Sequence, residues 1–284
     1  MGKILVIGST GTVGSLLFSR LEERGEKIKG ATRRPEEASK MHPKREYVAF
    51  DFEDETSFAP ALKEVDRVFL IARPGDPHPE RVAIPLIDEM KKKKISKVIN
   101  LTAMGIESQN DLTLRQVETY LEASGIDFTH RRPNWFMQVL ANGPLFQDIQ
   151  RTGSIHLPAE ESAISYVDVR DVAEVAATIL SEGGHFGKAY TLTGARALDH
   201  FEIARLLSDA AGKEIRYVPI SEEQAREGLE AAGLSLDRVE RLIGFYRLIR
   251  KGFCSPVSAE VETVLARPPI SFEQFSKDHA ACWR

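Results

Sequence analysis

Apolar residues in the first part of the chain follow two alternating patterns. Short apolar runs predict strands at 4–7, 27–32, 46–50, 67–72, 97–102 and 127–131. Between these runs, apolar positions recur every three or four residues, which predicts helices at 13–24, 56–63, 81–94 and 112–124. Strands that alternate with helices of this length predict an α/β fold with a doubly wound, parallel sheet of the Rossmann type.

The pattern changes after Pro133. We expect a helix at 135–150, short strands near Ile155 and at 164–167 and 189–193, and an irregular end around 267–269. Further helices are predicted at 169–181, 200–211, 222–232 and 236–251. We therefore expect a Rossmann domain at 1–150 and a smaller, mostly helical lobe at 151–284. Because no linker-like segment separates them, the lobe is expected to interleave with the core.

A spaced glycine triplet, Gly8, Gly11 and Gly14, directly follows the first strand run. The first glycine permits a sharp turn, the second lets a pyrophosphate approach the backbone, and the third lets the next helix pack closely. Such a triplet also occurs at ordinary strand–turn–helix corners, but the strand before it and the helix after it favour a dinucleotide site. The residues expected at the pyrophosphate are Gly8, Thr10, Gly11, Thr12 and Val13.

Two arginines, Arg33 and Arg34, follow the second predicted strand, where an NAD site usually has an acid. A carboxylate would repel a 2′-phosphate, whereas a guanidinium binds it through paired hydrogen bonds. The arginines therefore predict NADP(H) as the cofactor. The alternative is two solvated loop side chains.

The ends of the next strands supply further candidates for cofactor contacts. Asp51 and Phe52 follow the third strand, where the acid could accept from the adenine amino group or cap a helix. Ligands of open parallel sheets bind outside the carboxyl ends of the strands. We therefore expect the residues that end the fourth and fifth strands to border the cofactor, namely Ala72, Arg73, Thr102 and Ala103.

Composition and charge exclude several other classes of function. The chain is 42% hydrophobic and 28% charged, with a formal net charge of −4, which gives no electrostatic footprint for nucleic acid or an anionic membrane. We expect neither a signal peptide nor a membrane span, and hence a cytoplasmic protein. Cys254 and Cys282 lie near the end of the chain and suggest no disulfide framework, and no residue spacing indicates a metal site.

With these features placed, the chain resembles the NmrA-like branch of the atypical short-chain dehydrogenase/reductases, above all its azoreductase, quinone reductase and triphenylmethane-dye reductase members. The matching blocks are 7–14, 131–138, 165–173 and 189–194. The resemblance implies that the block at 131–138 lies against the nicotinamide and the substrate. It also implies that Asp168 and Asp171 are largely structural.

The chain departs from the wider family at the usual proton donor. Typical members use a Tyr-x-x-x-Lys pair, in which the lysine lowers the pKa of the tyrosine. None of the six tyrosines here has a lysine four residues later. Tyr120 is followed by Ser124, and Glu118 precedes it on the same predicted helix, where members of this branch often carry an acid. No catalytic residue is assigned.

These features predict a flavin-independent NADPH-dependent reductase that transfers hydride to a small, flat, conjugated acceptor, an azo compound or a quinone. Met104, Trp135 and Phe136 are the candidate acceptor contacts, with core packing equally open for Trp135. The alternative function is a catalytically silent NADP(H) sensor that acts through a protein partner. A biosynthetic imine or enone reductase is less favoured because no shaped proton donor is found. The sequence leaves the oligomeric state open.

Overall fold

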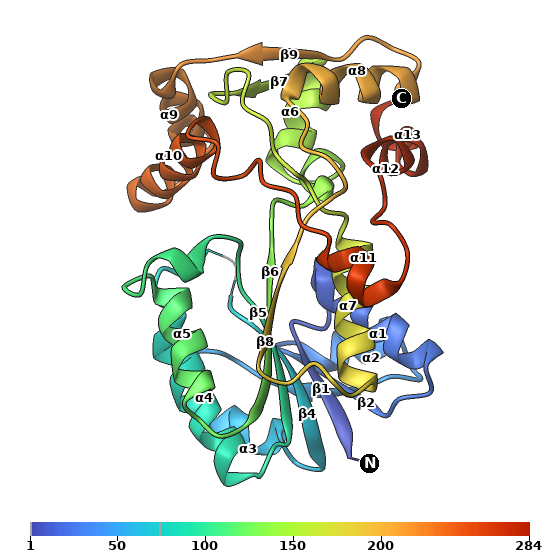
Figure 1. Ribbon diagram of the computed structural model, residues 1–284, viewed down its shortest axis with the longest axis vertical. Coiled ribbons are helices and arrows are strands. Elements are labelled where there is room, and N and C mark those ends of the chain that lie inside the picture. Colours follow the sequence, from blue (N-terminus) through green and yellow to red (C-terminus); the bar gives the residue numbers. More distant parts are fainter. Residues whose placement is uncertain (1, 74) are drawn as a thin grey trace. The chain divides into compact units, whose positions relative to one another are not determined.

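The computed structural model describes residues 2–73 and 75–284 (Figure 1). The chain divides into two compact units. The first unit comprises Met1–Pro133 and Val169–Leu192, and the second comprises Asn134–Asp168 and Thr193–Arg284. The chain therefore passes between the units three times. That the units act as a cofactor-binding domain and a substrate lobe stays a prediction.

The first unit is built on a seven-stranded sheet in which every pair is parallel. The strand order is β3-β2-β1-β4-β5-β6-β8, so the order reverses beside β1. This reversal is the point at which open α/β sheets bind ligands. The strands are β1 (Lys3–Ile7), β2 (Ile28–Thr32), β3 (Glu46–Ala49), β4 (Val65–Ile71), β5 (Lys97–Leu101), β6 (Asp127–Pro133) and β8 (Lys188–Leu192).

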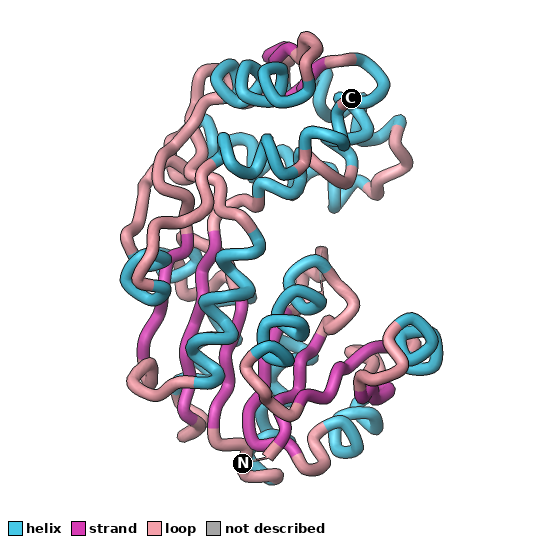
Figure 2. Tube along the Cα trace, turned by 90° about the vertical axis from the view of Figure 1, so that its right-hand side faces the viewer, coloured by secondary structure: helices cyan, strands magenta, loops and turns pink. Residues whose placement is uncertain are grey.

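Helices cover both faces of this sheet, which confirms the predicted Rossmann-type fold (Figures 1 and 2). On one face, α3 (Phe58–Ala61), α4 (Glu80–Lys92) and α5 (Thr113–Glu122) bury an apolar core against the strands. On the other, α1 (Thr12–Glu23) lies beside α7 (Val169–Ser181). The Arg24 guanidinium, just after α1, pairs with Glu174 of α7 at 2.5 Å.

The second unit is mostly helical, with one two-stranded parallel sheet. A large apolar core packs most of its helices, and the fully buried Trp283 donates its indole N–H to the Leu140 carbonyl at 2.8 Å. The strands are β7 (Ser154–Leu157) and β9 (Arg216–Pro219). The helices are α6 (Pro144–Thr152), α8 (His200–Ala211), α9 (Glu222–Ala231), α10 (Leu236–Arg250), α11 (Glu260–Leu265), α12 (Phe272–Asp278) and α13 (Ala280–Trp283).

Several predicted elements were wrong. The expected helix at 135–150 is a 3₁₀ turn (Met137–Leu140) followed by α6, because Gly143 adopts a φ of 88° and Pro144 starts a new helix. Residues 164–167 form isolated bridges, not a strand. Residues 266–271 are irregular as expected around 267–269, but the sequence predicted none of the helices α11, α12 and α13 on either side of them. It also predicted neither β9 nor α2 (Pro35–Met41).

Candidate cofactor site

The glycine-rich turn joins β1 to α1 in the first unit. Gly8 adopts a φ of 70°, and the Gly11 amide donates to the Gly8 carbonyl at 2.9 Å. Gly11 is the N-cap of α1, without a side-chain cap, and the first turn of α1 contains no acidic residue. Thr10, Gly11 and Thr12 are exposed. The first amides of α1 can therefore receive an anion from outside the protein.

Gly14 shows why the helix needs a glycine in its first turn. A Cβ on Gly14 would lie 2.1 Å from the Gly8 carbonyl oxygen and 2.7 Å from the Gly8 carbonyl carbon. Only a glycine lets α1 approach the turn this closely. The open amides and the side-chain-free cradle fit the pyrophosphate of a dinucleotide. Of the residues predicted at the pyrophosphate, the side chain of Val13 is buried, so only its backbone amide could take part. That this turn binds a pyrophosphate stays a prediction.

The two arginines after β2 differ in their surroundings. Both are exposed, but the Arg34 guanidinium pairs with Glu37 at 3.1 Å. Within residues 2–73 and 75–284, Arg33 forms no ion pair. Arg33 is therefore the arginine whose guanidinium is available to an incoming phosphate.

Three of the predicted cofactor contacts line one hollow of the first unit. They are Phe52, predicted near the adenine, and Ala72 and Arg73, predicted to border the cofactor. The Arg73 guanidinium is held at 2.5 Å by Glu53. The side chain of Asp51 accepts from the Glu53 amide at 3.0 Å, which makes a local turn. The acid that caps the following 3₁₀ helix (Glu55–Ser57) is Asp54, not Asp51.

A buried polar cluster lies where β5 and β6 end, beside α5. The Glu118 carboxylate is fully buried and accepts two hydrogen bonds from Arg132, at 3.0 and 2.7 Å. It also accepts from the Arg115 guanidinium at 2.9 Å and from the Thr102 hydroxyl at 2.7 Å. Although burial opposes ionisation, these donors hold the pKa of Glu118 below its ordinary value. Glu118 is therefore an anion, not a proton donor.

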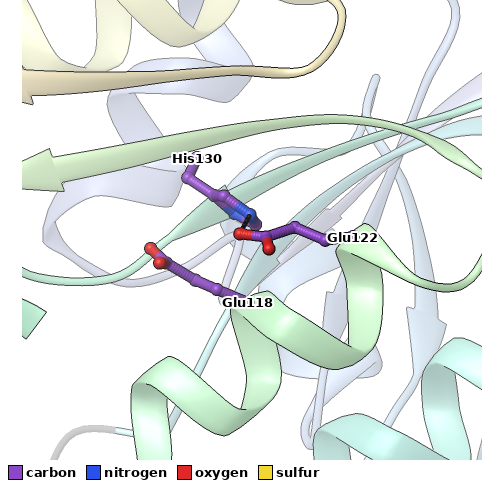
Figure 3. Close-up of side chains that lie close together, drawn as sticks. All are labelled: Glu118, Glu122 and His130. Carbon is purple, nitrogen blue, oxygen red and sulfur yellow. Dashed lines mark ion pairs between the residues drawn. The ribbon is translucent and has the colours of Figure 1, made fainter. Parts of the chain in front are cut away.

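Glu118, Glu122 and His130 come together in this cluster, with ligand atoms within 4.8 Å of one another (Figure 3). The His130 ring nitrogen lies 3.3 Å from Glu122, and burial lowers the pKa of this histidine. Three such residues could hold a metal ion. However, Arg115 and Arg132 already pair with the two carboxylates, and the charge of these guanidinium groups opposes the binding of a cation.

The tyrosine on α5 is engaged elsewhere. The Tyr120 hydroxyl donates to the Asp88 carboxylate at 2.7 Å, and this hydrogen bond raises the pKa of Tyr120. A lysine partner would have the opposite effect on the phenol. Tyr120 therefore does not replace the missing proton donor.

The candidate acceptor residues fall in both units. Met104, in the first unit, is half-buried, and its amide donates to the Pro133 carbonyl at 3.0 Å. Trp135 and Phe136 are half-buried in the second unit. The Trp135 ring meets the Phe245 ring of α10 edge to face, with centroids 6.2 Å apart and planes at 89°. Phe245 is 48% exposed, and the sequence analysis missed it.

The network around Glu118 was also missed in part. Glu118 was noted for its position on the helix, but its partners Arg115 and Arg132 were not. The spacing of Arg115, Glu118 and Glu122 along one helix face is a signal that could have indicated ion pairs. No comparable local signal links Phe245 to Trp135, because 110 residues separate them.

Comparisons with known proteins agree with this geometry. Residues 8–183 match the model of a family described as NAD(P)H-binding. An NAD(P)H azoreductase of Xenophilus azovorans is 30% identical over 285 residues, covering 99% of each chain. Prestalk A differentiation protein A of Dictyostelium discoideum is 29% identical, covering 97% of this chain and 91% of its own.

Solved structures show the same fold. Triphenylmethane reductase of Citrobacter sp. superposes with a TM-score of 0.87 at 21% identity, covering 99% of this chain and 100% of its own. The Escherichia coli NADPH-dependent quinone oxidoreductase QOR2, complexed with NADPH, has a TM-score of 0.85 at 22% identity and covers 97% and 99%. Within the described residues, no helix has both the length and the apolar character that a membrane crossing requires. The chain belongs to the NAD(P)H-binding family, as an oxidoreductase of its NmrA-like branch.

Proposed function

We propose that the protein is an NADPH-dependent reductase that delivers hydride directly to a flat, conjugated acceptor such as an azo compound or a quinone. The observation that carries the proposal is that neither Glu118 nor Tyr120, the two candidate proton donors on α5, is able to give a proton to a substrate. Glu118 is ionised among two arginines, and Tyr120 is bonded to Asp88. An acceptor that delocalises the incoming charge needs no acid from the protein, because water can supply the proton.

Two comparisons support this choice of acceptor. The relative that is 30% identical is an NAD(P)H azoreductase, and a structural neighbour is an NADPH-dependent quinone oxidoreductase. Azo bonds and quinones share a planar, electron-poor π-system. Both would present a flat face to an aromatic side chain such as Trp135.

The predicted cofactor contacts divide among the parts of the dinucleotide in this proposal. The turn at 8–13 binds the pyrophosphate, and Arg33 binds the 2′-phosphate. Asp51 and Phe52 lie by the adenine. Ala72 and Arg73 border the cofactor, and Thr102 and Ala103 lie by the nicotinamide ribose. When bound, the reduced nicotinamide supplies the hydride.

The protein's contribution to rate is then positioning of the acceptor. Met104, Trp135 and Phe136 would contact the acceptor and hold it against the cofactor. Trp135 suits this task because two neighbours restrain its ring, the edge-on Phe245 and the thiol of Cys254 that its indole N–H contacts.

A sensor function is the second candidate, and one comparison favours it. The Dictyostelium relative, which aligns with 97% of this chain, is a differentiation protein by name. In that function the protein would bind NADP(H) in the same cradle and signal through a partner.

Consumption of NADPH by the purified, flavin-free protein tests the proposal, with a panel of azo dyes and quinones and with NADH as control. Turnover with a strong preference for NADPH is expected. Tight NADPH binding without turnover of any acceptor would contradict the reductase and favour the sensor. Turnover that requires added flavin would contradict direct hydride transfer.

A further inference from the structure

Thr102 stands at the carboxyl end of β5 with a hydroxyl that has one strong partner. Its Oγ1 donates to the buried Glu118 carboxylate at 2.7 Å, and the Arg131 carbonyl lies farther away at 3.4 Å. The Thr102 amide also donates to the Arg131 carbonyl, at 2.9 Å, which fixes the backbone at this point. The side chain is half-buried and so retains access to solvent.

The direction of the hydrogen bond between Thr102 and Glu118 follows from charge. A carboxylate without its proton can only accept, and a threonine hydroxyl has one proton to give. Arg132 and Arg115 supply three further hydrogen bonds to the same carboxylate, which keeps it in the ionised form. The Thr102 proton is therefore committed to Glu118, and its oxygen lone pairs face away from the carboxylate.

We propose that Glu118 is a positioning residue of the cofactor site, which makes the Thr102 oxygen an obligate hydrogen-bond acceptor for an O–H or N–H group on the nicotinamide riboside half of NADP(H). This inference rests on the proposed function, which places Thr102 beside that half of the cofactor. It assigns the buried charge cluster a role that the proposed function does not give it.

Two groups on that half of the cofactor can donate, the ribose hydroxyls and the carboxamide N–H₂. Either group could donate to the Thr102 oxygen. Because the Thr102 proton already points to Glu118, the hydroxyl cannot rotate to present its own proton to that donor. The same commitment prevents Thr102 from giving a proton to the substrate. The charge cluster thus explains why the Thr102 hydroxyl at the end of β5 does not act as a proton donor to the substrate.

Binding of NADPH, measured by calorimetry without any acceptor, tests the inference. Thr102→Val removes the oxygen and keeps the shape, and we expect affinity about tenfold lower, the value of one hydrogen bond. Thr102→Ser keeps the hydroxyl and should bind within about twofold of the wild type. Glu118→Gln can donate its amide to Thr102 and release the hydroxyl proton, so affinity should also fall. Glu122→Gln, one turn further along α5, changes the same charge without touching Thr102 and serves as the matched control.

A double variant separates positioning from a general structural effect. If Glu118 acts through Thr102, adding Glu118→Gln to Thr102→Val should not weaken NADPH binding further. The analogue of NADPH with acetylpyridine in place of nicotinamide lacks the carboxamide N–H. If the wild type loses affinity for it and Thr102→Val does not, the donor is the carboxamide, whereas equal losses assign the ribose.

Three outcomes would overturn the inference. They are unchanged NADPH affinity in Thr102→Val, equal effects of Glu118→Gln and Glu122→Gln, and tighter binding by Glu118→Gln, which would make Thr102 a donor. Because the Thr102 variants leave the ion pairs of Glu118 intact, they remain informative even if Glu118→Gln fails to fold. None of these measurements depends on acceptor reduction, so the inference and the reductase function can fail separately.

Discussion

Replacing Gly14 by alanine tests whether close packing at the glycine-rich turn governs both stability and cofactor binding. Gly14 and Gly228 both lie inside helices, α1 and α9, and neither has a positive φ. By intrinsic helix propensity alone, each change to alanine should stabilise the protein by about 1 kcal/mol. A Cβ on Gly228 meets nothing within 4 Å, whereas one on Gly14 lies 2.1 Å from the Gly8 carbonyl oxygen.

At Gly14, the steric clash should turn the expected stabilisation into a destabilisation. The obstructing atoms are backbone, so β1 and α1 must move apart by roughly 1 Å to restore an ordinary contact. Overpacking of this kind costs about 1–3 kcal/mol, and more where the backbone cannot yield. Because the gain in helix propensity is the same in both variants, we expect Gly14→Ala to be less stable than Gly228→Ala by the overpacking cost alone, about 1–3 kcal/mol or more.

The assay is urea unfolding followed by circular dichroism, together with NADPH binding by calorimetry. Gly228→Ala should unfold at slightly higher urea than the wild type and bind NADPH normally. Gly14→Ala should unfold earlier and bind NADPH at least about tenfold more weakly, because the amides of α1 are displaced. If Gly14→Ala matched Gly228→Ala in both measurements, the packing argument would be refuted.

Three other changes probe separate parts of the molecule. Arg33→Ala should weaken NADPH binding about tenfold or more and leave NADH binding nearly unchanged. Arg34→Ala removes a guanidinium that is paired with Glu37, so its effect on NADPH binding should be smaller. Equal losses of affinity for NADPH and NADH in Arg33→Ala would disprove the assignment of Arg33 to the 2′-phosphate. Phe245→Ala should raise the KM for aromatic acceptors severalfold without altering that for NADPH, and Phe253→Ala, at a 61% exposed position, should alter neither. Burial lowers the pKa of His200 from 6.5 to about 4, so the unfolded chain takes up a proton first and stability should fall by about 3 kcal/mol as the pH drops from 6.5 to 4. Urea unfolding at both pH values should show a smaller loss in His200→Gln, and an identical loss would argue against this cause.

The parts of the site that the sequence predicts are those built from adjacent residues. The turn from Gly8 to Gly14 contains its own strand end, bend and helix start, so its geometry is a local property. Arg33 is likewise placed by the end of a strand that is visible in the apolar pattern. Helix α2 has a local signal as well, with Pro35 at its first position and Glu36 after it.

The remaining parts depend on register and packing between distant segments. Thr102 and Arg132 both reach Glu118 because β5 pairs with β6 so that Leu101 lies opposite Arg131, and because α5 packs beside these two strands. No periodicity in the chain specifies that alignment. The ring contact between Trp135 and Phe245 likewise depends on how the second unit packs its core.

The interruption of the first unit by residues 134–168 has a consequence for how the protein is made. When the ribosome has released only the first 133 residues, β6 has no neighbour on its outer edge, because its partner β8 (Lys188–Leu192) has not been synthesised. Helix α7, whose Glu174 pairs with Arg24 and whose Leu180 carbonyl accepts from Arg67, is missing too. Unpaired strand edges and uncovered apolar helix faces promote aggregation in nascent chains. The first unit is therefore completed late in translation, after residues 134–168 of the second unit have already emerged.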